Sequence, residues 1–128
     1  METDDLIATA TVLGQLPSLK NSRRIMRRGR NNLMVIKSVD ALAYEQVFLM
    51  AIPKKMRVGY GGPVSVKVRV WYQSKRSDLS TELLFDLLQK SGIILNDRQV
   101  HHVESFKGLD RDAPRVHFTV RKWEETDA

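Results

Sequence analysis

The sequence predicts an α+β fold in one domain, residues 1–128, with a mixed β-sheet and two helices packed on one face of that sheet. Three observations predict it. Residues 64–70 alternate valine with polar residues, as a half-buried strand does. Residues 38–52 and 79–91 carry apolar side chains at helical spacing. Strand-like segments surround these helices in the order β-β-α-β-α-β-β, a segregated pattern typical of α+β domains.

The N-terminal third predicts two strands joined by a loop. Residues 6–16 alternate in β-rich fashion and stop at Pro17, which predicts the first strand. Residues 17–30 are polar and basic and contain Gly29, so they predict a long mobile loop. Residues 33–36 (Leu-Met-Val-Ile) predict a short second strand.

The first helix is expected to begin after Ser38, which can cap it, and to run to about Ile52. Asp40 in its first turn suits the helix dipole. The C-terminal end of this helix is apolar nearly all round, through Phe48, Leu49, Met50 and Ile52. This is more apolar surface than one sheet face covers, which predicts a homodimer interface. The alternative is a helix buried on both sides within one core.

The second helix is expected over residues 79–91, ending at Gly92, which suits a left-handed C-cap. Residues 101–107 and 115–123 predict the last two strands. A polar connection containing Gly108 and Pro114 joins them, which predicts a hairpin with a long loop.

Composition excludes several classes of protein. The chain has 128 residues and no cysteine, which excludes a disulfide scaffold, a thiolate zinc site and a cysteine nucleophile. Its three histidines lack zinc-type spacing. The acidic N-terminus does not resemble a signal peptide, and no apolar stretch approaches the roughly 18 residues of a membrane span. We therefore expect a cytoplasmic protein.

The formal charge of +6 favours a nucleic-acid partner. Residues 20–37 contain seven cations and no acidic residue, a pattern that predicts binding to phosphates. The alternative is a solvated loop that only keeps the protein soluble. The candidate phosphate-binding cations are Lys20, Arg23, Arg24, Arg27, Arg28, Arg30 and Lys37.

Acidic residues recur every fourth position along the second predicted helix, at Asp78, Glu82 and Asp86, on the side opposite its leucines. Like charges at this spacing repel one another, so a divalent cation is one candidate counter-charge. The alternative is an ordinary surface, with Asp78 favouring the helix dipole and Asp86 paired to Lys90.

Three segments in the C-terminal half form the most specific pattern of the sequence: Arg76-Ser77-Asp78-Leu79, Phe85-Asp86-Leu87-Leu88-Gln89-Lys90-Ser91-Gly92 and Leu95-Asn96-Asp97-Arg98-Gln99-Val100. Through these segments the chain resembles the RusA family of Holliday-junction resolvase endonucleases. The family pattern is a basic-x-Asp-Leu-Asp-Asn segment, a helix ending in Lys-x-Gly, and Asp-Asp-x-Gln-Val. Residues 17–24, 36–38 and 43–45 are similar to the N-terminal part of that family.

The resemblance implies a homodimeric, metal-dependent nuclease, usually of phage or prophage origin, that resolves four-way DNA junctions in recombination and repair. Asp78 and Asp97 would bind Mg²⁺ or Mn²⁺, and Glu82 is the expected third carboxylate, since magnesium prefers hard oxygen ligands. Lys37 would add a positive charge at the catalytic site. Asn21 and Arg76 would join the basic residues that bind DNA.

The sequence departs from the family at three points. Ser80 stands where the family has its second aspartate, Asn96 replaces the first residue of the Asp-Asp pair, and the family's helix lysine has no counterpart. These departures keep two alternatives open. One is a weakly active or inactive nucleic-acid-binding module on the same fold. The other is an unrelated basic protein, in which Asp78, Glu82 and Asp86 are ordinary exposed residues of a helix.

Overall fold

The computed structural model describes residues 5–17, 23–28, 32–75 and 79–124, and of residues 23–28 and 32–37 only the backbone. Eight helices and strands lie in this part of the chain, together with two short 3-10 turns. In chain order they are β1 (Leu6–Leu13), β2 (Arg23–Arg28), β3 (Asn32–Lys37), α1 (Val39–Ala51), η2 (Lys54–Met56), β4 (Val64–Tyr72), α2 (Glu82–Lys90), η3 (Asp97–Gln99), β5 (Val100–Leu109) and β6 (Arg115–Lys122).

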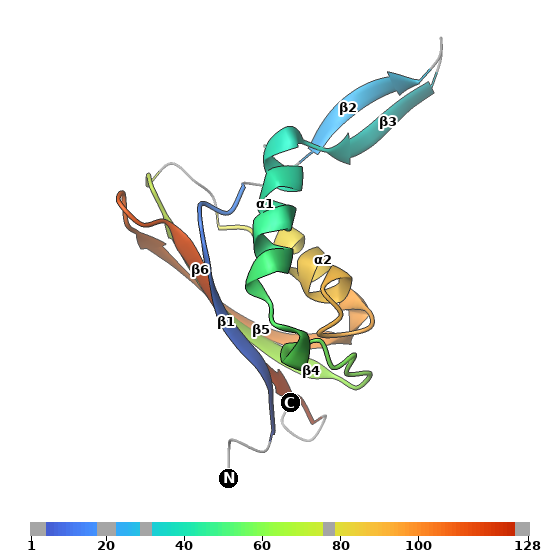
Figure 1. Cartoon of the computed structure of the whole chain (residues 1–128), viewed down its shortest axis with the longest axis vertical. Helices are drawn as coiled ribbons and strands as arrows, with labels where there is room; N and C mark the ends of the chain where they lie inside the picture. The colour runs from blue at the N-terminus through green and yellow to red at the C-terminus, as the bar shows by residue number, and fades with distance from the viewer. Residues whose placement is uncertain (1–4, 18–22, 29–31, 76–78, 125–128) are drawn as a thin grey trace.

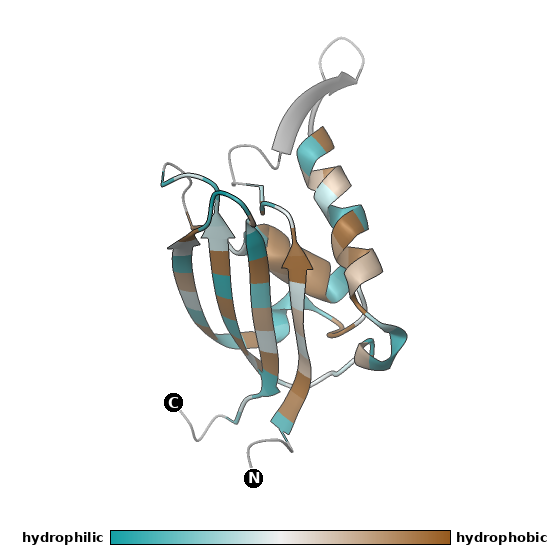
Figure 2. Cartoon of the chain, turned by 60° about the vertical axis from the view of Figure 1, so that its left-hand side comes forward, coloured by the Kyte–Doolittle hydropathy of each residue, from teal (hydrophilic) through white to brown (hydrophobic). Residues whose placement is uncertain are grey.

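The main sheet has the strand order β1-β6-β4-β5. Its β4–β5 pair is parallel, whereas β6 is antiparallel to both β1 and β4, so the sheet is mixed. Both helices lie against one face of it, and the other face is open (Figures 1 and 2). The predicted α+β class, with two helices on one face of a mixed sheet, is confirmed.

The core lies between the sheet and the two helices. Alternate residues of β4 and β6 point into it, and the leucines of α2 cover them, because residues spaced by three or four share one side of a helix. Phe48 of α1 stacks on Phe118 of β6 with ring centroids 5.7 Å apart. The fully buried members include Val64, Val66, Val68, Val70, Leu84, Leu87, Leu88, Val116 and Val120.

The predicted hairpin of the last two strands is wrong, because β4 lies between β5 and β6. The chain leaves β4, forms α2 and returns as β5 beside and parallel to β4, since a helical crossover joins parallel strands. The chain then passes the end of β4, where the Asp110 N–H donates to the Tyr72 carbonyl at 2.8 Å. β6 therefore pairs with β4 on its other side.

The predicted loop over residues 17–30 is wrong in its second half, where β2 forms an antiparallel ladder with β3. The observed order thus contains one strand more than predicted. The register sets Ile25 opposite Val35 and Met26 opposite Met34, so apolar positions coincide at the centre of this hairpin. The many arginines concealed that pattern in the sequence. The β2–β3 hairpin projects away from the main sheet (Figure 1).

The helix boundaries were predicted more accurately at the caps than elsewhere. The Ser38 hydroxyl accepts from the Ala41 N–H at 3.1 Å, as expected of an N-cap. Gly92 has a φ of +86°, the left-handed conformation expected after α2. However, α2 begins at Glu82, and residues 79–81 precede it, so the helix is shorter than predicted. Among the described residues, no helix has the length and apolar character that crossing a membrane requires.

The end of α1 is not buried on both sides. Phe48 and Ile52 are buried in the core, whereas Met50 is 86% exposed. Val39, Leu42 and Val47 are exposed along the same outward side of the helix. The alternative of a helix enclosed within one core is therefore wrong, and α1 carries an exposed apolar strip.

Candidate metal site and nucleic-acid surface

Asp97 opens the η3 turn, which carries the chain from α2 into β5. A capping box closes this turn: the Asn96 Oδ1 accepts from the Arg98 N–H at 2.9 Å, and the Gln99 Oε1 accepts from the Asn96 N–H at 2.7 Å. The same Gln99 oxygen also accepts from the Leu95 N–H at 2.9 Å. The local sequence thus folds into a compact turn held by its own side chains.

Two glutamines anchor this turn to the rest of the protein. The Gln99 amide nitrogen donates to the carbonyl oxygens of Tyr60 and Gly62, both at 2.7 Å. The Gln89 Oε1 of α2 accepts from the Asp97 N–H at 3.0 Å. Asp97 itself is exposed. Its backbone is therefore held in place while its side chain faces solvent.

Two of the three acidic residues that recur at every fourth position, Glu82 and Asp86, lie on α2. Glu82 is the first residue of the helix, and Asp86 follows one turn later with its Oδ2 atom buried. Lys90, the expected partner of Asp86, donates instead to Glu45 of α1 at 3.1 Å. This ion pair joins the two helices, and its carboxylate partner, Glu45, is only 7% exposed.

Within the described part of the chain, no three histidine, aspartate or glutamate side chains gather closely enough to hold a metal ion. Glu82 and Asp97 consequently do not complete a metal site with another described residue. Asp78 and Arg76 lie outside the described residues. Lys37 ends β3, directly before the Ser38 cap of α1, and its side chain also lies outside the description.

The predicted phosphate-binding stretch is divided between the hairpin and undescribed segments. Arg23, Arg24, Arg27 and Arg28 belong to β2, and the register pairs Arg23 with Lys37. Lys20, Asn21 and Arg30 lie outside the described residues. The cations of β2 and β3 therefore sit on the arm that projects from the main sheet (Figure 1).

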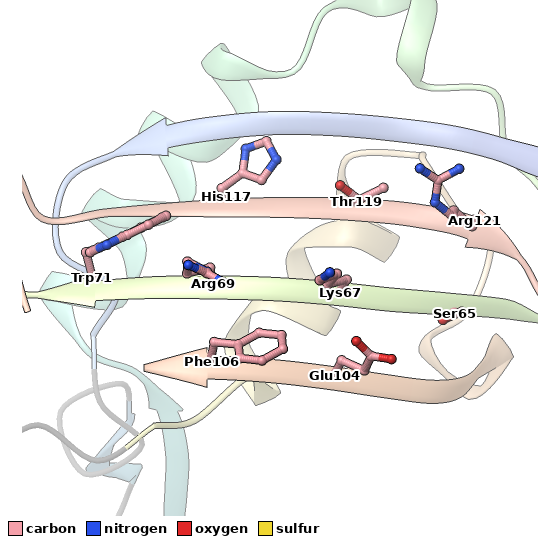
Figure 3. A pocket seen from close by; sticks show the side chains of 9 residues that line it. All are labelled: Ser65, Lys67, Arg69, Trp71, Glu104, Phe106, His117, Thr119 and Arg121. Atoms are coloured by element: carbon pink, nitrogen blue, oxygen red, sulfur yellow. The ribbon is translucent and has the colours of Figure 1, made fainter. Parts of the chain in front are cut away.

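A second basic surface, which the sequence interpretation missed, lies on the open face of the main sheet. It is a shallow pocket of about 640 Å³. Figure 3 shows the side chains that line it, from β4, β5 and β6: Ser65, Lys67, Arg69, Trp71, Glu104, Phe106, His117, Thr119 and Arg121. The sequence carries a signal for this surface, since Lys67, Arg69 and Trp71 alternate with the buried valines of β4, but the alternation over residues 64–70 by itself predicts only a half-buried strand.

One edge of this pocket is held by an ion pair. Arg115 donates to Asp110 at 2.8 Å and lies 4.0 Å from the centre of the Trp71 ring. The hydrogen bond from Arg115, together with those from the backbone N–H groups of Ala113 and Asp112, holds the pKa of Asp110 below its ordinary value. The loop between β5 and β6 is thereby tied to the indole of Trp71.

A scan against protein-family models finds no family that matches this chain, and a search of curated proteins finds no relative. The fold and the two surfaces therefore describe the class of protein. The chain is a basic α+β protein with a projecting cationic hairpin, an anchored and exposed aspartate, and a sheet face that combines cations with aromatic rings.

Proposed function

We propose that this protein is a magnesium-dependent endonuclease that cuts branched DNA, such as four-way junctions, during recombination or repair. The observation that carries the proposal is the anchored turn at Asp97. Gln89 and Gln99 hold the backbone of this turn, and the Asp97 carboxylate is exposed. A carboxylate that binds a metal ion has to be presented in a defined position, and supporting hydrogen bonds of this kind provide it.

The resemblance to the RusA family supports the same site. Asp97 and Gln99 correspond to the aspartate and glutamine of the family's Asp-x-Gln-Val segment. In this protein Gln99 makes four hydrogen bonds, to Leu95, Asn96, Tyr60 and Gly62. A glutamine two residues after the aspartate therefore has a physical role, which is to hold the turn that presents the carboxylate.

Asp78 and Asp97 would hold the metal ion, with Glu82 as a third carboxylate. Mg²⁺ keeps several water ligands and needs only one or two protein carboxylates, and Mn²⁺ also accepts such ligands. When bound, the ion would lower the pKa of an attacking water and stabilise the charge that develops on the phosphate. Lys37, at the end of the cationic hairpin, would contribute positive charge near the scissile phosphate.

We further propose that the active form is a homodimer. A four-way junction requires two cuts related by approximate two-fold symmetry, and a C2 dimer supplies two matching sites. The exposed strip of α1 offers an interface, because Val39, Leu42, Val47 and Met50 are uncharged and accessible. Apolar strips of this kind mark association surfaces more often than single scattered residues do.

The test is incubation of the protein with an end-labelled four-way junction, with and without Mg²⁺, beside the Asp97→Asn variant. We expect paired cuts near the branch point that require the metal and the Asp97 carboxylate. Cleavage in EDTA, or an Asp97→Asn variant that cuts at the wild-type rate, would overturn the proposal. A linear duplex of the same length is the control for structure specificity.

A second candidate function is a binding module without catalysis. It is favoured by Ser80, which stands at the position of the family's second aspartate. Tight binding of a four-way junction, with no cleavage in either Mg²⁺ or Mn²⁺, would support this function over the nuclease.

A further inference from the structure

The open face of the main sheet brings together side chains that are far apart in the sequence. The register places Arg69 of β4 between His117 of β6 and Phe106 of β5, in one row across three strands. Neighbouring strands lie about 4.8 Å apart, so the backbones of Phe106 and His117 lie roughly 10 Å apart with Arg69 between them. Figure 3 shows both rings on the open side of the sheet.

The cations on this face lie close to aromatic rings. The Arg69 guanidinium carbon lies 5.1 Å from the centre of the Phe106 ring, and the Lys67 Nζ lies 5.7 Å from the same centre. Within the part of the chain that the structure describes, neither cation forms an ion pair with a carboxylate. Both positive charges therefore remain available to an anionic ligand beside the Phe106 ring.

Other charges on this face are already paired. Arg115 binds Asp110 at 2.8 Å, and Arg121 binds Asp5 at 3.0 Å. The acidic residue in the pocket is Glu104, which lies opposite Lys67 and 3.9 Å from the Nε2 of His102. Lys67 and Arg69 thus outnumber Glu104 at the centre of the face, and the chain as a whole carries a charge of +6.

The aromatic surface is held in place. Gly108 lies opposite Trp71, and a Cβ atom at Gly108 would come within 2.7 Å of the indole. The indole therefore lies across β5 where only glycine leaves room, and Arg115 covers it. His117 is held by a 2.9 Å hydrogen bond between its Nδ1 and the Thr11 hydroxyl. Phe106 is 40% exposed and keeps part of its ring open to solvent.

We propose that this open face binds single-stranded DNA, with Phe106 and His117 stacking on unpaired bases and Lys67 and Arg69 binding the adjacent phosphates. Ring faces recognise unpaired bases regardless of sequence, whereas bases inside a duplex are already stacked on each other. Alternating cations and rings on an exposed sheet are one way to bind such a strand. The choice of DNA over RNA rests on the proposed function, and the binding itself requires neither the metal nor cleavage.

The experiment is fluorescence anisotropy with a labelled oligo-dT of about 20 nucleotides in EDTA, over a series of salt concentrations. Replacing Phe106 by Ala should weaken binding roughly 5- to 150-fold, the range for removal of one base–ring stack. Phe106→Trp should restore it, because a larger ring keeps the stacking surface. The Lys67→Ala/Arg69→Ala double variant should reduce the salt slope by about 0.7 for each phosphate that is no longer neutralised.

The matched controls lie away from this face. Lys54→Ala/Lys55→Ala removes the same charge from the exposed η2 turn and should leave binding to oligo-dT nearly unchanged. Val58→Ala removes an exposed apolar side chain that lines neither the pocket nor the exposed strip of α1. Thermal unfolding of each variant verifies that it is folded.

The outcomes separate this inference from the proposed nuclease function. Wild-type affinity in both Phe106→Ala and the Lys67/Arg69 double variant would overturn the inference, whether or not the protein cuts junctions. Equal losses of affinity for oligo-dT and for a blunt duplex in Phe106→Ala would also overturn it, as would tighter binding of oligo-rU than of oligo-dT. A dimer in sedimentation that Phe106→Ala converts to a monomer would overturn it too, because the open face would then be the interface between two copies of the chain. Intact oligo-dT binding with no junction cleavage would support the inference while the nuclease proposal fails.

Discussion

The side-chain oxygen of Gln89 accepts a hydrogen bond from the backbone N–H of Asp97 at 3.0 Å, which ties the end of α2 to the turn that precedes β5. Gln89 lies seven residues after Glu82, or about 10 Å along a helix at 1.5 Å per residue. The turn at Asp97 is thus attached near the C-terminal end of α2, whereas Glu82 begins the helix. Glu82 and the Asp97 turn are therefore attached to opposite ends of α2.

Asp78→Asn and Asp97→Asn should each abolish magnesium-dependent cleavage of a four-way junction. Binding of the junction should stay the same or become tighter, because removal of a carboxylate lowers the repulsion of phosphate. Gel-shift and cleavage assays on the same preparations measure both effects. If either variant cut at close to the wild-type rate, the residue would not be a metal ligand.

Gln99→Ala should destabilise the protein by about 2–4 kcal/mol, since it removes four hydrogen bonds that each contribute roughly 1 kcal/mol. Urea unfolding followed by circular dichroism measures the change. The neighbouring exposed residue provides a control, and Arg98→Ala should change the free energy of unfolding by less than about 0.5 kcal/mol. A Gln99→Ala variant as stable as the wild type would show that the turn does not depend on this side chain.

Replacement of Arg27, Arg28 and Arg30 by Ala should weaken binding to all DNA sequences alike. The salt dependence of duplex binding should become shallower by about 0.9 for each phosphate that these arginines neutralise in the wild-type complex. A variant with Lys54, Lys55 and Arg111 replaced by Ala carries the same net charge and serves as the control. An unchanged salt slope would mean that these arginines are only solvated.

Met50→Arg should convert a dimer to a monomer at micromolar concentration, because it places a charge in the exposed strip of α1. Met50 is 86% exposed, so the change should cost the isolated subunit little stability. Light scattering coupled to gel filtration reports the mass, and Leu13→Arg, at the exposed end of β1, is the control. A wild-type protein that is monomeric alone and on junction DNA, and still makes paired cuts, would exclude the dimer.

Tyr44→Phe should stabilise the protein by about 1 kcal/mol. The Tyr44 hydroxyl is buried without a hydrogen-bond partner among the described residues, and an unsatisfied buried group costs free energy. Burial, and after it the neighbouring Tyr72, raises the pKa of the Tyr44 phenol far above its ordinary value of 10.0. The folded state therefore retains the proton longer than the unfolded state does.

The sign of the pH effect at Tyr44 follows from this difference. Below pH 10 the phenol is protonated in both states and stability is unaffected. Above pH 10 the unfolded state releases its proton first, so wild-type stability should fall as the pH rises. Tyr44→Phe should lose less stability over the same range. Equal alkaline slopes in the two proteins, measured by urea unfolding, would show that Tyr44 is not the group responsible.

Local patterns predicted those parts of the protein in which neighbouring residues decide the structure. The Ser38 cap, the left-handed Gly92 and the alternating valines of β4 all follow from short-range rules, and each is found. The arginines of β2 obscured a strand whose apolar centre, Ile25 and Met26, is only two residues long. A pattern that short does not distinguish a strand from a loop until its partner strand is known.

Periodicity and composition are properties of the chain alone, and they were enough to predict the α+β class, the two helices, the excess of positive charge and the absence of cysteine chemistry. Only the folded protein shows that β5 pairs with β4 rather than with β6. The same is true of the hydrogen bond from the Asp97 N–H to the Gln89 side chain. Folding also brought Phe106, Arg69 and His117 into one row. Periodicity specifies which face of a strand is buried, but the partner of that strand depends on long-range packing and on the crossover through α2.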